Sequence, residues 1–399
     1  MKPPLSGIRV LDLTNVLSGP FCCHQLVHMG AEVIKVEIPG SGDLARQLGA
    51  DPTLNEKDMG ISFLAQNPGK KSITVNLKSP EGKEILRKLV KTSDVLVENF
   101  RPGVMDRLGV GFEKLKQENS TLIYCAISGF GQDGPMKGLP AYDQIIQGIS
   151  GVMSITGSKE TAPYRVGYPL CDTIGGMTAA FAIAAALADH NREHARFIDV
   201  SMLEATMATM GWVVSNHLIG GIDPMPLGND NFTSSPSGTF KTCDKEINIA
   251  ANKQEHFESI CHIIERVELI TDPRFSVRQS RLENRVELTK LLENSFQNWT
   301  ANDLLDTFKE AGVPAGPVNS IPDILADPQI RDRGMIATYE NVADVHLPVK
   351  VLRPGFKING KAPSVETPPP TLGEHTQSLM KELGYGDDKI EKLHSEGVI

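Results

Sequence analysis

One stretch of the sequence, Tyr164–Gly176 (YRVGYPLCDTIGG), places a carboxylate where it could do chemistry. Asp172 stands immediately before a segment rich in Gly and Ala that predicts a helix. A carboxylate at a helix N-terminus interacts favourably with the helix dipole and stays ionised. Gly175 and Gly176 also leave room for a large ligand to approach the backbone. Asp172 is therefore a candidate nucleophile, a candidate general base or simply the N-cap of the helix, and the local sequence leaves these roles open.

Two glycine-containing segments resemble phosphate-binding motifs but lack an essential part. Residues 69–72 (GKKS) match the end of a phosphate-binding loop, but Leu64 stands where the loop needs a glycine, and the segment leads into a predicted strand. Gly40, Gly42 and Ala45 match a loose dinucleotide fingerprint, but no clear helix begins there. Neither segment predicts a nucleotide-hydrolysing or dinucleotide-binding site.

A pair of histidines offers the spacing of a metal site. His24 and His28 are four residues apart on a predicted helix, next to Cys22 and Cys23. That spacing can place two ligands on one helix face. Because no acidic third ligand stands nearby, we expect two ordinary helix histidines and no bound metal.

The elements that must position these residues follow an α/β pattern in the first two hundred residues. Short apolar runs that predict strands alternate with segments that predict helices, which is typical of a parallel sheet. Strands are expected at Ile8–Leu13, Glu32–Glu37, Ser72–Asn76, Val95–Val97, Leu122–Ile127 and Phe197–Val200, with helices at Phe21–Met29, Glu81–Lys91 and Phe112–Gln117.

Two apolar helices are expected near the middle of the chain. Thr173–Ala188 (TIGGMTAAFAIAAALA) is apolar nearly all round, and such a helix should be buried. Its longest apolar run, Met177–Ala188, is shorter than the roughly 20 residues that span a bilayer, so we expect no membrane segment. Leu203–His217 predicts a second apolar helix.

The composition changes after these helices. Gly220–Thr239 is rich in Gly, Pro, Asn and Ser and predicts a linker or crossover. A strand at Ile247–Ala251 and three helices follow, which indicates a smaller second domain. The helices are expected at His256–Val267, Arg281–Ser295 and Ala301–Ala311.

Charge and cysteine content limit the function classes. The chain has 399 residues, with 40 Lys and Arg against 49 Asp and Glu, and a net charge of −9. This acidic balance argues against a nucleic-acid-binding surface. Six cysteines are sparse for this length and fit reduced thiols, and the N-terminus MKPPLSGIRVLDL has no signal-peptide pattern. We therefore expect a cytoplasmic protein.

Blocks along nearly the whole chain resemble the family III CoA-transferases, which include formyl-CoA:oxalate and carnitine CoA-transferases. Their order and spacing carry the resemblance. The blocks are PLSGIRVLDLTNVLSGPFCCHQLVHMGAEVIKVEIPGSGDLAR, NPGKKSITVNLKSPEGKEIL, VENFRPGVMDRLGVGFEKL, ISGFGQDGPMKGLPAYDQIIQGISG, YRVGYPLCDTIGG, AGVPAGPVNSI and LGEHTQSLMKELGY.

The resemblance implies an α/β fold with a large Rossmann-like domain and a smaller α+β domain, in an interlocked homodimer. The large CoA-binding domain would span residues 1–215, with the C-terminal segment 330–399 returning to it. Residues 216–329 would form the linker and the small domain.

The resemblance also assigns roles to residues. Asp172 would be the nucleophile, forming first a mixed anhydride with the donor's acyl group and then an aspartyl-CoA thioester. A CoA thioester would be a substrate, with no tightly bound cofactor. Lys78 and Arg107 would pair with the phosphates of CoA. Phe100 and Leu108 would flank the adenine. Further CoA contacts would come from Val16, Val75, Asn99 and Tyr142, the last of these near Asp172.

Departures from the formyl-CoA:oxalate enzyme point to other substrates. That enzyme has Gln where Leu17 stands, a basic residue where Ile38 stands, and a tetraglycine loop that is missing here. We expect CoA to move from succinyl-CoA or acetyl-CoA to a small dicarboxylate such as oxalate, glutarate, itaconate or mesaconate. Arg165 is a candidate ligand of the acceptor carboxylate, and a structural salt bridge is the alternative.

Two other functions remain open. The fold is shared by 2-methylacyl-CoA racemases, in which a His–Asp pair moves the α-proton. Here the block reads Ala141-Tyr142-Asp143, so Tyr142 replaces that histidine, which favours transfer. A non-catalytic CoA-binding scaffold is disfavoured because Asp172 and the basic residues are all present.

Overall fold

The computed structural model describes residues 2–189 and 191–399. Contacts divide the chain into two compact units. The first contains residues 1–152, 165–220 and 328–399, and the second contains residues 153–164 and 221–327.

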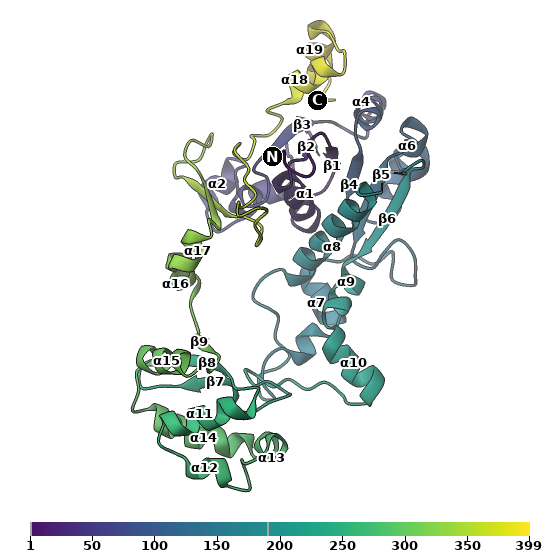
Figure 1. Cartoon of the computed structure of the whole chain (residues 1–399). Coiled ribbons are helices and arrows are strands. Elements are labelled where there is room, and N and C mark those ends of the chain that lie inside the picture. Colours follow the sequence, from purple (N-terminus) through teal and green to yellow (C-terminus); the bar gives the residue numbers. More distant parts are fainter. Residues whose placement is uncertain (1, 190) are drawn as a thin grey trace. The chain divides into compact units, whose positions relative to one another are not determined.

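A six-stranded sheet forms the centre of the first unit (Figure 1). All neighbouring strands in it are parallel, which confirms the predicted α/β class with a central parallel sheet. The strands are β1 (Arg9–Asp12), β2 (Glu32–Glu37), β3 (Lys70–Thr74), β4 (Val95–Glu98), β5 (Ile123–Ser128) and β6 (Arg196–Ser201).

The order of the strands shows where a ligand would bind. The order is β3-β2-β1-β4-β5-β6, which is that of the doubly wound dinucleotide-binding fold. The order reverses between β1 and β4, and in such sheets ligands bind at the carboxyl ends of the strands beside that reversal. A ligand site is therefore expected at the loops that follow Asp12 and Glu98.

Helices cover the two faces of this sheet, and several short elements were not predicted. The larger helices are α1 (Ser18–His28), α4 (Pro80–Lys91), α6 (Phe112–Glu118), α7 (Asp143–Ile149), α8 (Leu170–Leu187), α9 (Met202–Thr209), α10 (Gly211–Gly220), α18 (Thr376–Glu382) and α19 (Asp387–Ser395). The shorter elements are η1 (Leu44–Gln47), α2 (Pro52–Glu56), α3 (Ile61–Leu64), α5 (Val104–Leu108), α17 (Pro328–Asp332) and the antiparallel pair β10 (Ile336–Tyr339) and β11 (Val349–Leu352), and η2 (Val152–Ile155) begins at the last residue of the segment 1–152 and continues into the second unit.

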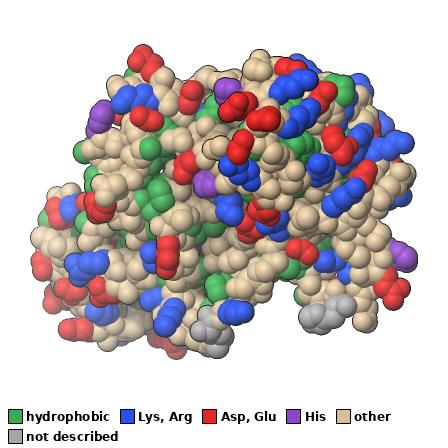
Figure 2. Space-filling view, turned by 90° about the horizontal axis from the view of Figure 1, so that it is seen from above, with side chains coloured by type: hydrophobic (Ala, Val, Ile, Leu, Met, Phe, Trp, Pro, Cys, Tyr) green, Lys and Arg blue, Asp and Glu red, His purple; other side chains and the backbone are tan. Residues whose placement is uncertain are grey.

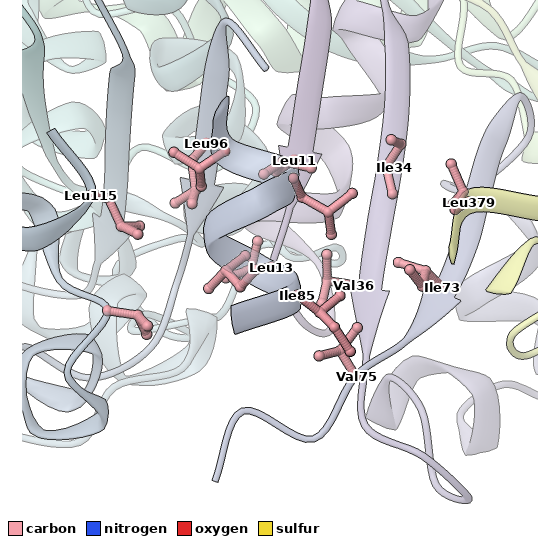
Figure 3. Close-up of a cluster of buried hydrophobic side chains, with 14 of the residues drawn as sticks. Leu11, Leu13, Ile34, Val36, Ile73, Val75, Ile85, Leu96, Leu115 and Leu379 are labelled. Carbon is pink, nitrogen blue, oxygen red and sulfur yellow. The ribbon is translucent and has the colours of Figure 1, made fainter. Parts of the chain in front are cut away.

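Alternate residues of each strand enter different cores, as the two-residue period of a strand requires. Val10 of β1 packs with α1 and α8 on one face, whereas Leu11 packs with α4 and α18 on the other. Figure 3 shows Leu379 of α18 beside Ile73 of β3. The last helices of the chain thus complete the core of the sheet that the first residues build.

Helix α8 corrects the prediction of a fully buried apolar helix. It packs along α1 and β5, and its buried residues lie on that side. Met177 and Phe181 are exposed, with 49% and 75% of their surface accessible. Within one chain, α8 therefore buries only part of its apolar surface. The helix also has the length and hydropathy of a membrane span, and 39% of that span is buried within the chain.

The second unit joins a small antiparallel sheet to a group of helices, an α+β arrangement. Phe257, Phe275, Phe296 and Phe308 are fully buried in its core. The strands, in the order β7-β8-β9, are β7 (Ser237–Lys241), β8 (Glu246–Ala250) and β9 (Ala315–Pro317). The helices are α11 (Gln254–Ile263), α12 (Glu268–Thr271), α13 (Arg278–Glu283), α14 (Arg285–Phe296), α15 (Ala301–Glu310) and α16 (Ile321–Ala326).

Charged side chains of both signs cover the surface. Figure 2 shows Lys and Arg interspersed with Asp and Glu over the visible face, with small apolar areas between them. The excess of acidic residues is thus spread over this face rather than gathered in one field.

Candidate active site

Asp172 lies inside the first turn of α8 and not in front of the helix. The helix begins at Leu170, so Asp172 is its third residue. The backbone N–H groups of Cys171 and Asp172 donate to Oδ1 of Asp143, at 2.8 and 3.4 Å. Asp143, at the start of α7, therefore caps α8. The N-cap interpretation of Asp172 is wrong, and its carboxylate is free for another task.

A cavity of about 220 Å³ opens in front of Asp172. It lies at the carboxyl ends of β1, β4 and β5, where the strand order places a ligand. Five of the residues expected at the site line it together, namely Val16, Asn99, Phe100, Tyr142 and Asp172. Arg101, Ser128 and Met202 are also part of its wall.

The environment of Asp172 raises its pKa to about 7. Burial is the main cause, because it disfavours the charged form, and the negative charge of Asp143 adds to it. The helix dipole led us to expect a fully ionised carboxylate, and these two effects outweigh it. Near neutral pH, Asp172 is thus divided between its two protonation states.

Asp143 is held by side chains on its far side. Gln147 donates to its Oδ2 at 2.7 Å, and the Arg165 guanidinium lies 3.7 Å from the same oxygen. Arg165 is thus next to Asp143 and is not among the residues that line the cavity. Arg165 and Asp143 thus form the ion pair that was the alternative for Arg165, and binding of an acceptor carboxylate by Arg165 stays a prediction.

The loops after β1 and β4 are locked to each other. The N–H of Asn15 donates to Oδ1 of Asn99 at 2.9 Å, and Nδ2 of Asn99 donates back to the carbonyl of Asn15 at 2.8 Å. Val16 has a φ of 67°, a left-handed conformation that is strained for a β-branched residue. Its N–H donates to Oδ1 of Asp43 at 2.9 Å, which holds it there. These hydrogen bonds hold this wall of the cavity in place.

A buried ion network lies beneath that wall. Nζ of Lys35 is 2.8 Å from Oδ2 of Asp43 and donates to the carbonyl of Thr14 at 2.8 Å. Nζ of Lys70 lies 2.8 Å from Oδ2 of Asp12. Burial raises the pKa of Asp43, but Lys35 and two backbone N–H groups outweigh it and hold that pKa below its usual value. The network therefore stays charged and fixes the loop that carries Val16.

A second cavity, of about 360 Å³, adjoins the first. Val75, Lys78, Phe100 and Leu108 line it, and Phe100 and Asn15 belong to both cavities. Arg107 is exposed on α5 and lines neither of them. The expected CoA contacts thus fall into two groups that meet at Phe100, with Arg107 outside both.

The two histidines considered as metal ligands are buried in α1. Their ring centroids are 4.4 Å apart, and burial lowers the pKa of His28 to about 4 and that of His24 well below its usual value. In the part of the chain that the structure describes, no group of three or more His, Cys, Asp or Glu side chains is arranged to hold a metal.

Sequence reasoning missed three residues that shape this site. Asp143 caps α8 from 28 positions away, Asp43 holds the Val16 loop from another strand end, and Arg101 lines the cavity with Asp172. Only Asp143 had a visible signal, because it follows Tyr142 in a block already singled out. The other two act through contacts that only the folded sheet creates.

Comparison with known proteins identifies the family of this chain. The model of CoA-transferase family III matches residues 5–376. A succinyl-CoA:glutarate CoA-transferase from Mus musculus is 38% identical over 99% of this chain and 90% of its own length. An acetyl-CoA:oxalate CoA-transferase from Acetobacter aceti is 37% identical over 97% of this chain and 98% of its own.

A solved structure of a related protein has a similar fold. The crystal structure of a CaiB/BaiF family protein from Brucella suis superposes with a TM-score of 0.84 at 33% identity, covering 96% of this chain and all of that one. The named relatives are transferases, which favours CoA transfer over the racemase alternative. This chain belongs to CoA-transferase family III.

Proposed function

We propose that this enzyme moves CoA from succinyl-CoA or acetyl-CoA to a small dicarboxylate through a covalent intermediate on Asp172. One observation carries the proposal: a buried carboxylate with a pKa of about 7 lines a small cavity that opens beside a larger one. Relatives that act on succinyl-CoA and glutarate or on acetyl-CoA and oxalate support this substrate class.

The first half of the reaction loads CoA onto the enzyme. A carboxylate oxygen of Asp172 attacks the thioester carbon, the carbon–sulfur bond breaks, and CoA leaves as the thiolate. The resulting mixed anhydride joins the side chain to the donor's acyl group. The thiolate then attacks the aspartyl carbonyl, which releases the donor acid and leaves an aspartyl-CoA thioester.

The second half runs the same chemistry in the opposite direction. The acceptor carboxylate attacks the aspartyl thioester and displaces the thiolate, which forms a new anhydride. The thiolate attacks the acyl carbonyl of the acceptor, and Asp172 returns as a carboxylate. No net proton is moved, so no general acid is required, but water must be kept away from the anhydride.

CoA would occupy the larger cavity. Its apolar wall, with Val75 and Leu108, suits the adenine, and Lys78 is available for a phosphate. Arg107 would reach a phosphate from the rim, since it is exposed on the same short helix as Leu108. Phe100 stands at the junction, and the thioester would pass it to reach Asp172.

The working form would be an interlocked homodimer, in which residues 1–215 and 330–399 form the CoA-binding domain and 216–329 the linker and small domain. The exposed apolar residues of α8 and α10 support a partner of the same kind, because a second copy would cover them. The six free cysteines, five of them buried, suit a cytoplasmic enzyme. We propose no tightly bound cofactor beyond the CoA thioester itself.

A substrate screen tests this function. Purified protein is mixed with succinyl-CoA or acetyl-CoA and one of oxalate, glutarate, itaconate or mesaconate, and the new thioester is measured by liquid chromatography. We expect transfer to at least one dicarboxylate and none with Asp172→Asn. Exchange of the α-deuterium of a 2-methylacyl-CoA, without transfer to any acid, would instead establish the racemase alternative.

A further inference from the structure

Among the described residues, one positively charged residue lines the smaller cavity together with Asp172. Of the described residues that line it, only Arg101 and Asp172 are charged. Arg101 lies on the turn between β4 and α5, and its carbonyl accepts the N–H of Val104 at 3.1 Å, which fixes the turn. Its side chain is exposed and forms no ion pair with any described carboxylate. Its guanidinium is therefore available to an anion that enters this cavity.

The position of Arg101 separates it from the expected phosphate site. The larger cavity, where the nucleotide of CoA would lie, has Lys78 as its positive group and does not include Arg101. Arg101 instead lines the same cavity as Asp172, where the reacting acyl group would lie. A guanidinium matches a carboxylate with two parallel hydrogen bonds, so the anion that suits this place is a second carboxylate.

We propose that Arg101 binds the distal carboxylate of the acyl group, the one that does not react at Asp172. The inference rests on the proposed function and names the substrate class of the same cavity. An α,ω-dicarboxylate would present one end to Asp172 and the other to Arg101. A succinyl donor and a dicarboxylate acceptor each carry such a group, so one subsite serves both halves of the reaction.

The size of the cavity agrees with short substrates. About 220 Å³ is less than the 300–1,000 Å³ typical of sites for drug-sized ligands, and it suits an acyl group of a few carbons. Arg165, the residue that the sequence suggested for this role, is engaged by Asp143 and lies outside the lining. The subsite thus belongs to a different arginine from the one expected.

The test compares acids that differ only in the distal carboxylate. Transfer to glutarate and to pentanoate is measured for wild type, Arg101→Gln, Arg101→Lys and Lys137→Gln. Lys137 is the matched control because it lines a small neighbouring cavity with Arg101 but not the cavity of Asp172. Thermal melts check that each variant is folded, and equilibrium binding of glutarate is measured calorimetrically without CoA.

A charge-assisted bond of this kind predicts that Arg101→Gln lowers kcat/KM for glutarate about 10- to 100-fold. The kcat/KM for pentanoate should be nearly unaffected by Arg101→Gln. Arg101→Lys should keep part of the preference for glutarate over pentanoate, and Lys137→Gln should keep all of it. In Arg101→Gln, the ratio of kcat/KM for succinyl-CoA to kcat/KM for acetyl-CoA should also fall, in parallel with kcat/KM for glutarate. Where pentanoate is not turned over, its inhibition constant replaces its rate.

Two results would overturn the inference. If Arg101→Gln lowers kcat/KM equally for glutarate and pentanoate, or equally for succinyl-CoA and acetyl-CoA, then Arg101 binds CoA itself and not the distal carboxylate. If glutarate binds the wild type and the variant with the same affinity, there is no such subsite. A wild type that binds glutarate through Arg101 but transfers no CoA would instead contradict the proposed function alone.

Discussion

Asp172 must be ionised to attack a thioester, yet its surroundings favour the neutral acid. Burial and the nearby Asp143 raise its pKa to about 7. A poorly solvated carboxylate is a stronger nucleophile than a hydrated one. The environment that raises the pKa of Asp172 therefore also makes its ionised form more reactive. Arg165, 3.7 Å from Asp143, offsets part of the negative charge beside the nucleophile.

The pH dependence of the loading step should show this balance. Because only the carboxylate reacts, the rate of formation of the aspartyl-CoA thioester should rise with pH and level off above about 7. Asp143→Asn removes the neighbouring negative charge but keeps an oxygen to cap α8. It should therefore lower the pKa of Asp172 and move this rise to lower pH. Stopped-flow or quenched-flow rates from pH 5 to 9 measure it, and an unchanged profile in Asp143→Asn would argue against the coupling.

At the scale of elements, the close approach of α1 and α8 places Asp172 at the cavity. A side chain on Gly176 would put its Cβ only 2.3 Å from the carbonyl oxygen of Ser18, on the backbone of α1. Backbone cannot move aside as a flexible side chain can. Gly176 therefore allows the helix contact that sets the position of the first turn of α8.

Gly176→Ala should force the two helices apart. We expect the free energy of unfolding to fall by roughly 1–3 kcal/mol, with a loss of transfer activity as Asp172 shifts. Gly211→Ala is the matched control, because it is a helical glycine with nothing within 4 Å of an added Cβ, and it should be neutral or slightly stabilising. Denaturant unfolding measures the free energy of unfolding of both variants. Equal values for Gly176→Ala and Gly211→Ala would show that the contact between α1 and α8 can relax.

The sequence could predict the central strands because buried parallel strands are continuous apolar runs. Ile8–Leu13 contains β1, and the predicted Glu32–Glu37 is β2. Short elements such as α2 and β11 give too few residues for a periodic signal. The start of α8 was misplaced for a different reason: its cap is Asp143, which lies far away in sequence, so local residues could not reveal it.

At the scale of the whole molecule, the apolar helices leave more surface exposed than one chain can account for. Phe181 on α8 and Ile219 on α10 are 75% and 87% exposed. The sequence predicted burial for Thr173–Ala188, but the pattern of one chain does not show whether the same copy or a second copy covers the helix. A second copy of the chain is the partner that the family resemblance implies.

An interlocked dimer should behave differently from two chains that only touch. We expect light scattering after gel filtration to give twice the mass of the 43.4 kDa chain at all accessible dilutions. Differently tagged dimers mixed under native conditions should not exchange subunits, because linked chains separate only on unfolding, and they should mix after joint denaturation and refolding. A monomeric mass would contradict the dimer, and rapid native exchange would contradict the interlocking.

The covalent intermediate on Asp172 is the central claim, and intact-protein mass spectrometry tests it most directly. Wild type mixed with succinyl-CoA in the absence of acceptor should gain the mass of CoA less one water, and hydroxylamine should convert this adduct to a hydroxamate on the peptide that contains Asp172. Asp172→Asn should gain nothing under the same conditions. Full transfer activity without any adduct on Asp172, or transfer by Asp172→Asn, would contradict the account.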